Sequence, residues 1–418
     1  MRIRILRIAA GGDGVGKLDD GRAVFIPRTA PGDLVEVDRV REAKRFARAR
    51  LVRVLEPGPN RVLPPCPHYT RDDCGGCQLQ HLSAAAQLSA KQSIVGETLR
   101  RVGKVELPDP SVIPAAKMWE YRAKITLARD GEGRIGLHPM DRPDRVFNLD
   151  RCHITEPALM AVWKVMRRSL RLLPGDLTHL VLRLDREGNR HLVLETGGKR
   201  AWQGGDQLEA ALLSEGVPAV IWYHPDGGAA RVVAGAADAY PATVFEQVNP
   251  EMGDTARGFA LERLGAVQGR HVWDLYSGIG ETTAALLQQG GTVESVEADP
   301  RAVRLAQTRA RQVLKIAEQG KFPPGVVCHV GRVEETLEKL KDPDLIIANP
   351  PRIGMDRRAV ELILKRAPRR LVYISCDAAT LSRDIARLAP RLRPTGVQAF
   401  DMFPQTAHVE TVTVLEAA

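Results

Sequence analysis

From about residue 243 to the C-terminus, apolar runs of strand length alternate with segments of helical periodicity. The predicted elements are 272–276, 283–288, 292–297, 301–315, 345–348, 357–365, 371–375 and 379–389. Strands that alternate with helices build a parallel, doubly wound sheet, and such α/β sheets bind ligands beyond the carboxyl ends of their strands. We therefore expect the chemistry of this half of the chain on the loops that follow its strands.

The first half of the chain follows different patterns. Residues 1–56 contain short β-rich runs separated by turn signals, Asp19-Asp20-Gly21 and Pro31-Gly32, which predict a small all-β barrel of the OB type. The middle is α+β in character, with predicted helices at 83–102 and 156–173 and predicted strands at 121–127 and 134–137. A chain of 418 residues has room for all three parts, since a domain usually takes about 100–200 residues.

The chain is basic, with 60 Lys and Arg against 51 Asp and Glu. The most basic segment carries Arg39, Arg41, Lys44, Arg45, Arg48, Arg50 and Arg53 against the single acid Glu42. This run favours phosphate binding, although a solvated strand pair is the simpler alternative. No apolar run approaches the roughly 18 residues of a membrane span, and Arg4 and Arg7 interrupt the N-terminal apolar stretch, so we expect a cytoplasmic protein.

A glycine-rich loop follows the first predicted strand of the C-terminal half. Asp274 starts the motif, Gly278 and Gly280 form its turn, and Glu297 ends the next strand. Glycines let a cofactor approach the backbone, and an acid at that place hydrogen-bonds ribose hydroxyls. The third glycine of a dinucleotide fingerprint is missing, so an adenosyl cofactor such as S-adenosylmethionine fits better than NAD. A tight turn with an unrelated acid is the alternative.

Two later strands also end in residues with chemical potential. Asn349-Pro350-Pro351-Arg352 forms a stiff loop whose Asn349 amide can donate to and accept from a flat base. Cys376 follows the strand 371–375 at a predicted helix start, where backbone N–H groups favour a thiolate. Glu410 starts the last predicted strand and can reach the same edge as a general base. A capped loop and an inert buried cysteine are the alternatives.

Four of the six cysteines suggest a metal site. Cys66, Cys74 and Cys77 lie close in sequence, with Cys152 as a distant fourth thiol. A long chain without an export signal has no need of disulfides, so clustered thiols more often bind metal. Spacing alone does not separate zinc from an iron–sulfur cluster. Cys328 is left over and is expected in the core.

Together these motifs resemble the RNA uracil-5-methyltransferases, in particular the 23S ribosomal RNA branch with an N-terminal TRAM domain and a [4Fe-4S] cluster. The resemblance covers essentially the whole chain. It rests on the four cysteines, on Phe245-Glu-Gln247-Val-Asn249, on Asn349-Pro-Pro-Arg352, on Ile374-Ser-Cys376, on His408-Val-Glu410 and on Tyr121-Arg122-Ala-Lys124. It implies a class I, Rossmann-like methyltransferase domain, a TRAM OB-fold barrel and an α+β iron–sulfur domain.

The resemblance also assigns residues. The implied catalytic residues are Cys376 and Glu410. The implied S-adenosylmethionine-binding residues are Gln247, Tyr276, Gly278, Gly280, Glu281, Glu297 and Asn349. The implied cluster ligands are Cys66, Cys74, Cys77 and Cys152, and the implied RNA-binding residues are Arg45, Arg48, Arg50, Arg122 and Lys124. Three positions depart from the family pattern: Asn349 replaces an aspartate, Asp377 replaces an asparagine, and the glycine loop continues as Glu281-Thr282.

We expect a TRAM domain at 1–57, an iron–sulfur domain at 58–82 and 108–240, and a methyltransferase domain at 83–107 and 241–418. The expected reaction forms 5-methyluridine in RNA, most readily 23S rRNA, through addition of the Cys376 thiolate to carbon 6 of uracil. A tRNA substrate, cytosine-5 methylation and a zinc-stapled RNA-binding protein without catalysis are the alternatives. We expect the protein to bind RNA but no membrane, and to be a monomer.

Overall fold

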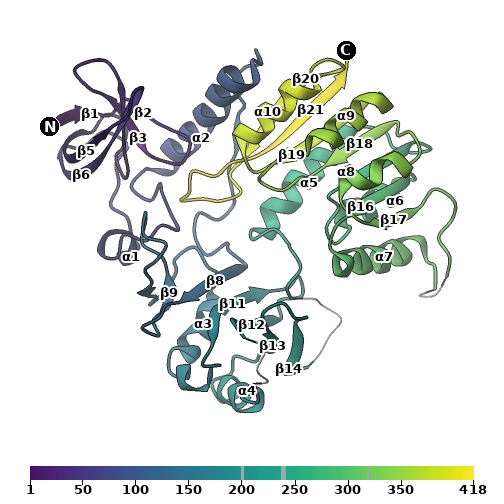
Figure 1. Cartoon of the computed structure of the whole chain (residues 1–418), viewed down its shortest axis with the longest axis horizontal. Coiled ribbons are helices and arrows are strands. Elements are labelled where there is room, and N and C mark those ends of the chain that lie inside the picture. The colour runs from purple at the N-terminus through teal and green to yellow at the C-terminus, as the bar shows by residue number, and fades with distance from the viewer. Residues whose placement is uncertain (199–201, 237–241, 318–319) are drawn as a thin grey trace.

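A computed structural model describes residues 1–198, 202–236, 242–317 and 320–418. The chain forms three sheets in sequence order, which Figure 1 shows in purple, in teal and in green to yellow. Within the described residues, no helix is both long enough and apolar enough to cross a membrane.

The N-terminal sheet has six strands in the order β1-β5-β6-β4-β3-β2. Its strands are β1 (Arg2–Arg4), β2 (Arg7–Ile8), β3 (Gly14–Lys17), β4 (Ala23–Ile26), β5 (Leu34–Glu42) and β6 (Phe46–Glu56). Buried and open positions alternate along β5 and at the start of β6, as a strand with one core face requires. The predicted β-rich runs of residues 1–56 are therefore confirmed as strands.

The middle sheet has seven strands in the order β10-β9-β8-β11-β12-β13-β14. They are β8 (Lys124–Arg129), β9 (Ile135–Leu137), β10 (Phe147–Asn148), β11 (Leu177–Leu184), β12 (Arg190–Thr196), β13 (Val220–His224) and β14 (Arg231–Ala234). Helices α3 (Pro157–Met166) and α4 (Gly205–Ser214) share its apolar core. The short helix α1 (Pro67–Arg71) precedes this sheet in the chain.

The C-terminal sheet has eight strands in the order β17-β16-β15-β18-β19-β21-β20-β7. They are β7 (Val112–Ile113), β15 (His271–Leu275), β16 (Thr292–Glu297), β17 (Val327–Val330), β18 (Leu345–Ala348), β19 (Arg370–Ser375), β20 (Leu392–Phe400) and β21 (Glu410–Ala417). The expected all-parallel sheet is wrong at one end: β21 runs antiparallel to both β19 and β20. Only nine residues, 401–409, join β20 to Glu410, too few for a crossover helix, so the chain returns as a hairpin.

Helices cover both faces of the C-terminal sheet. One core contains α5 (Pro250–Leu264), α6 (Glu281–Gln288) and α7 (Pro300–Leu314). The other contains α2 (Ala84–Thr98), α8 (Val333–Thr336), α9 (Arg357–Arg366) and α10 (Ala378–Leu388). Helix α2, drawn in blue, precedes the middle sheet in sequence but packs beside α10 (Figure 1). Its N-cap is Ser83, and a π-helical turn (Leu99–Gly103) extends it over most of the predicted range.

Strand order reverses at β15, which pairs with β16 on one side and β18 on the other. In open α/β sheets such a reversal leaves a crevice at the carboxyl ends of the strands, where the connections diverge to opposite faces. The loops after β15, β16, β18 and β19 begin at this edge. The fold therefore places every strand-end motif of the C-terminal half around one crevice.

Candidate active site

A cavity of about 1340 Å³ lies between the middle and C-terminal sheets. Fourteen of the predicted site residues line it: Cys66, Cys74, Cys77, Cys152, Arg122, Lys124, Gln247, Tyr276, Gly278, Glu281, Glu297, Asn349, Cys376 and Glu410. Gly280 does not line this cavity, and neither do Arg45, Arg48 and Arg50 of the N-terminal sheet. One hollow thus combines the glycine loop, the cysteine set and the candidate nucleophile.

The glycine loop turns sharply between β15 and α6. Gly280 has φ +77° and serves as the N-cap of α6, and a Cβ there would lie 2.5 Å from the Cβ of Ala306. Gly278 has φ +53°, and the space where its Cβ would stand is open. Only glycine adopts such positive φ angles without strain, and only glycine fits the close approach at position 280. Gly280 shapes the loop, whereas Gly278 leaves its backbone accessible to a ligand.

Glu297 is fixed at the carboxyl end of β16. Its carboxylate accepts the N–H of Gly278 at 3.0 Å and the N–H of Asp299 at 2.9 Å. Each oxygen retains a free lone pair for a ligand hydroxyl. The carboxylate therefore braces the glycine loop from the position where ribose-binding acids occur in this fold.

Thr283 occupies the position of the missing third glycine. Its hydroxyl donates to the buried Asp274 carboxylate at 2.6 Å. Burial raises the pKa of Asp274 to about 7, because removal from water disfavours the charged form. The Asp274–Thr283 contact ties the start of the glycine motif to α6.

Glu281 is held by two arginines. Its carboxylate accepts from Arg186 at 2.7 Å and pairs with Arg257 of α5. Arg186 lies in the turn between β11 and β12 and also holds Asp254 of α5 with two hydrogen bonds, at 2.8 and 3.0 Å. This four-residue network joins the middle sheet to the first turn of the helix after the glycine loop.

Gln247 and Asn349 face the same cavity from different loops. Gln247 precedes α5 and packs against Gly253, where a Cβ would lie 3.1 Å from the Cβ of Gln247. Asn349 follows β18, and its backbone N–H donates to the carbonyl of Leu275 at 3.1 Å. Among the described residues, the side-chain amide of Asn349 has no hydrogen-bond partner, so both its donor and its acceptor are open to a ligand.

Cys376 lies between β19 and α10, as the sequence predicts. The expected thiolate stabilisation by the helix start is wrong. The side chain of Asp377 caps α10 by accepting the N–H groups of Ala379 and Thr380, so these donors are not free for the sulfur. Burial and the nearby Glu410 carboxylate raise the pKa of Cys376.

Glu410 is buried at the start of β21, beside the nucleophile. Both of its carboxyl oxygens are buried and lack a hydrogen-bond partner among the described residues. Burial raises its pKa to about 7, and the positive charge of Arg352 opposes this rise. Arg352 also lowers the pKa of Cys376, which places one guanidinium within electrostatic reach of both groups. Arg352 stands inside the Asn349–Arg352 motif, but its role was missed because only the fold brings it to the cysteine.

The predicted basic pair of the middle domain reaches the cavity. Arg122 donates through Nε to the carbonyl of Lys124 at 2.8 Å, and both residues line the hollow. Burial and the neighbouring Arg183 lower the pKa of Lys124. Arg122 and Lys124 therefore line the cavity from the middle domain.

The four cysteines of the predicted metal site gather at one end of the cavity. Each of Cys66, Cys74 and Cys77 has a raised pKa, first because of burial, and Cys152 adds to the rise in all three. Burial raises the pKa of Cys74 to about 11. Among the described residues, no group of three or more His, Cys, Asp or Glu side chains is arranged to hold a metal ion.

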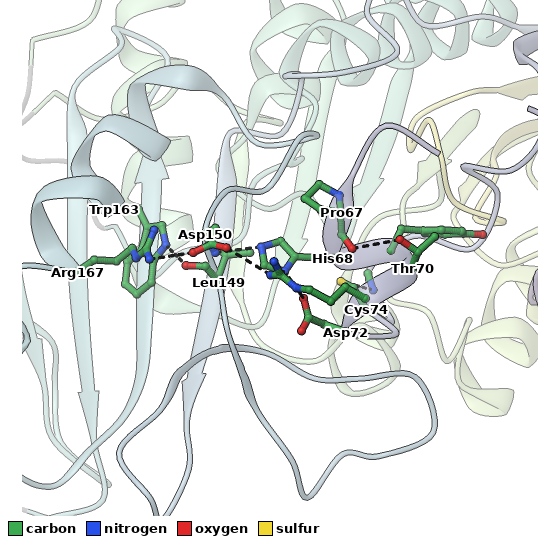
Figure 2. Close-up of polar contacts among 12 residues, drawn as sticks. Pro67, His68, Thr70, Asp72, Cys74, Leu149, Asp150, Trp163 and Arg167 are labelled. Atoms are coloured by element: carbon green, nitrogen blue, oxygen red, sulfur yellow. Dashed lines mark hydrogen bonds and ion pairs between the residues drawn. The ribbon is translucent and has the colours of Figure 1, made fainter. Parts of the chain in front are cut away.

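Helix α1 is tied to the segment that carries Cys152. The N–H of Asp150 donates to His68 Nε2 at 3.0 Å, so His68 Nδ1 carries the proton and donates to Asp72 at 2.6 Å (Figure 2). Arg167 of the middle domain pairs with Asp150 at 2.8 Å. These contacts bring the chain around Cys66 and Cys74 next to the distant Cys152.

The basic run on β5 and β6 is partly neutralised. Arg50 makes two hydrogen bonds to Asp38, Arg53 pairs with Glu36 at 2.6 Å, and Arg48 lies 3.6 Å from Asp13. The acids stand outside the run or on the facing strand, so counting charges along 39–53 did not find them. Arg39, Arg41, Lys44 and Arg45 are exposed and have no acidic partner among the described residues.

Known proteins resemble this chain over its whole length. A model of the tRNA (uracil-5-)-methyltransferase family matches residues 328–418, and a tRNA (uracil(54)-C(5))-methyltransferase TRAM domain model matches residues 1–60. The 23S rRNA (uracil(1939)-C(5))-methyltransferase RlmD of Halomonas elongata is 32% identical over 98% of this chain and 88% of its own length. An uncharacterised RNA methyltransferase of Gloeobacter violaceus is 32% identical over 99% of this chain and 96% of its own.

A solved structure shares the fold. The tRNA (uracil-54, C5)-methyltransferase of Pyrococcus abyssi, in complex with S-adenosyl-L-homocysteine, superposes with a TM-score of 0.71 at 22% identity, covering 99% of this chain and all of that one. The fold and these matches thus define an α/β methyltransferase with an N-terminal TRAM domain. The chain belongs to the RNA uracil-5-methyltransferase family.

Proposed function

We propose that this enzyme methylates carbon 5 of one uridine in 23S rRNA, through a covalent cysteine intermediate. The observation that carries the covalent route is the buried, unpartnered Glu410 carboxyl group beside Cys376 on the wall of one cavity. The rRNA substrate is supported by the 23S rRNA enzyme that matches nearly the full chain. A tRNA substrate is the second candidate, favoured by the names of the two family models.

Carbon 5 of uracil is too weak a nucleophile to take a methyl group from a sulfonium, and so release the thioether, without activation. The Cys376 thiolate forms a bond to carbon 6, and the electron pair of the carbon 5–carbon 6 double bond moves into an enolate. When it is bound, S-adenosylmethionine supplies the methyl group that carbon 5 receives, without the bonding electron pair. Glu410 then takes the proton from carbon 5, and the returning electron pair expels the thiolate.

Arg352 assists both protein groups of this scheme. Its charge favours the ionised forms of Cys376 and Glu410, which burial disfavours. The open amide of Asn349 accepts the ring N–H of uracil and donates to an adjacent carbonyl, without supplying charge. The target base has to leave its stack to reach this depth, which a cavity flanked by Arg122 and Lys124 accommodates.

We further propose the cofactor contacts. Glu297 holds the ribose hydroxyls, and the loop that contains Gly278 and Gly280 lets the adenosyl group approach. Gln247, Tyr276 and Asn349 face the remainder from the cavity walls. Glu281 contributes through its network with Arg186 and Arg257, which fixes the helix that the cofactor adjoins.

The four cysteines are proposed to hold a [4Fe-4S] cluster that stabilises the middle domain. Burial and the nearby Cys152 raise the pKa of Cys66, Cys74 and Cys77, and a set of four thiols without histidine fits a site that would bind them as thiolates to iron. The iron and zinc contents of anaerobically purified protein would distinguish a cluster from a single zinc ion.

The test separates the two chemical steps. Cys376→Ala is expected to abolish methylation and every covalent enzyme–RNA species. Glu410→Gln keeps the shape but not the basicity, so it is expected to accumulate a denaturation-resistant adduct while turnover falls by about 10²–10⁴-fold. The substrate is 23S rRNA from cells lacking the enzyme, with tRNA from the same cells beside it. Methylation by Cys376→Ala would rule out the covalent route, and exclusive methylation of tRNA would reassign the substrate.

A further inference from the structure

Residues 401–409, the base loop, join β20 to the proposed base Glu410. Because the carboxyl oxygens of Glu410 have no hydrogen-bond partner among the described residues, the position of this group depends on its backbone, which pairs with Phe400 of β20 and continues from the base loop. The base loop is buried at nearly every residue, yet it contains no helix or strand to fix its path. Side chains from other parts of the chain therefore have to hold it.

Gln405 is the most constrained residue of the base loop. Its φ of +69° lies in the left-handed region, which costs free energy for a residue with a side chain. Its N–H donates to Gln87 Oε1 at 2.9 Å, and its carbonyl accepts the N–H groups of Gln78 at 3.1 Å and Leu79 at 2.9 Å. Gln87 Nε2 also donates to the side-chain Oε1 of Gln405 at 2.9 Å. Four hydrogen bonds therefore hold Gln405, three to its backbone and one to its side chain.

Gln78 holds the base loop a second time, nearer to the base. Its Oε1 accepts the N–H of Ala407 at 3.3 Å, three residues before Glu410. Its Nε2 donates to the carbonyl of Gly75 at 2.8 Å, between Cys74 and Cys77. One side-chain amide therefore bridges residues 74–77, the cysteine turn, and the base loop.

The TRAM domain closes over the same bridge. Gly12 approaches so tightly that a Cβ there would lie 2.6 Å from the Cβ of Gln78 and 3.2 Å from the Cβ of Ala407. With φ +94°, this position accepts only glycine without strain. The amide of Gln78 is thereby confined to its two partners.

We infer that Gln78 and Gln87 are positioning residues for Glu410, and that through Gln78 the cysteine turn sets the geometry of proton removal. The inference rests on the proposed role of Glu410 as the base. Cys376 follows β19 instead, and neither glutamine bonds to that strand. Loss of either amide should therefore slow departure of the thiolate and leave its addition to carbon 6 unchanged.

The experiment follows adduct formation and adduct decay separately, in the full-length enzyme with S-adenosylmethionine and 23S rRNA from cells lacking the enzyme. Gln78→Met and Gln87→Met keep side-chain length and remove both polar groups. Adduct decay is expected to slow about tenfold or more, with formation within about twofold of wild type, because small misplacements of a reacting group carry penalties of this size. Gln398→Met is the matched control, since Gln398 bonds to Ser111 and does not line the cavity.

A merely structural role would slow formation and decay in the same proportion, and that result would overturn the inference. Unchanged decay in both variants would overturn it as well. Glu410→Gln is run in parallel: if it accumulates adduct and the glutamine variants do not, the inference fails alone. If Glu410→Gln accumulates none, the proposed base itself is wrong.

Discussion

At the scale of single residues, Glu410 carries a large electrostatic cost. Its carboxyl group is fully buried, and its pKa of about 7 lies well above the ordinary 4.5. The folded chain therefore holds this proton more tightly than the unfolded chain. Below about pH 4.5 both states are protonated and no penalty arises. As the pH rises through 7, the native state bears the cost of a buried charge.

Glu410→Gln is expected to stabilise the protein at pH 8 but not at pH 4.5. A rise from 4.5 to about 7 corresponds to about 3 kcal/mol in the free energy of unfolding. Chemical denaturation at both pH values measures the difference, which cancels any pH-independent effect of the amide. Glu187→Gln makes the same chemical change on the surface and should show no such dependence. Equal effects of Glu410→Gln at both pH values would contradict the raised pKa.

Most of the residues that the sequence patterns singled out line the cavity, because each motif follows a strand. Gly278, Asn349 and Cys376 lie at strand ends, and parallel strands bring such ends together. Arg352, Gln78 and Gln87 could not be assigned roles in the same way. Their partners lie tens to hundreds of residues away, and only packing shows which carbonyl or thiol each one reaches. The predicted direction of the Cys376 pKa shift was wrong for the same reason. Both the cap of α10 and the proximity of Glu410 become visible only in the folded structure.

At the scale of elements, the β5–β6 hairpin divides the basic run into two kinds of arginine. Those on the body of the sheet pair with facing acids, whereas the residues near the turn remain free. A charge that already has a bidentate partner gives up that contact before it binds phosphate. We therefore expect RNA affinity to depend chiefly on Lys44 and Arg45, with Arg48 and Arg50 contributing less.

Replacing Lys44 and Arg45 by Gln should reduce the slope of log affinity against log salt by about 1.5, since each lost phosphate contact removes about 0.7–0.9. Replacing Arg50 and Arg53 instead is the matched control and should change the slope by less than half as much. Binding of 23S rRNA at several salt concentrations measures both. An unchanged slope after loss of Lys44 and Arg45 would identify the hairpin as a solvated surface.

The cysteine turn is the element that joins α1, Cys152 and the base loop. Anaerobically purified protein is expected to be brown, with about four irons and four sulfides per chain. Cys74→Ser should lower the iron content and the thermal stability of the middle domain, whereas Cys328→Ser, which alters a cysteine outside the set, should change neither. Colourless anaerobic protein with stoichiometric zinc would contradict the cluster.

At the scale of the whole molecule, the cavity belongs to no single sheet. Arg186 from the middle sheet holds Asp254 and Glu281 of the C-terminal part, and this contact spans the boundary beside the glycine loop. Most predicted strands and helices of the N-terminal and C-terminal parts match observed elements, whereas β11–β14 and α4 of the middle part were not predicted. The contact of Arg186 with Asp254 and Glu281 was not predictable, because the sequence of the turn 185–189 does not indicate which surface the turn packs against. The exact domain boundaries stay a prediction.

Arg186→Met is expected to weaken S-adenosylmethionine binding about fivefold, because a partly exposed charged network contributes about 1 kcal/mol. Calorimetric titration with S-adenosylmethionine or its demethylated product measures the change. Arg358→Met removes a comparable pair with Glu338 on the outer surface and should leave affinity unaltered. Wild-type affinity in Arg186→Met would show that the middle sheet does not organise the cofactor loop.

The docking of α2 against the C-terminal sheet has a consequence for synthesis. Lys91 of α2 forms a fully buried ion pair with Asp401, 310 residues later. At about 5–20 residues per second, a ribosome needs about 15–60 s to make that partner. Throughout this interval α2 can pack against Ile8 and Ala30 of the N-terminal part through Ala90 and Ile94, but Lys91 lacks its carboxylate partner. The buried ion pair can therefore form only after Asp401 has been made, and the core that α2 shares with the C-terminal sheet cannot be completed before then.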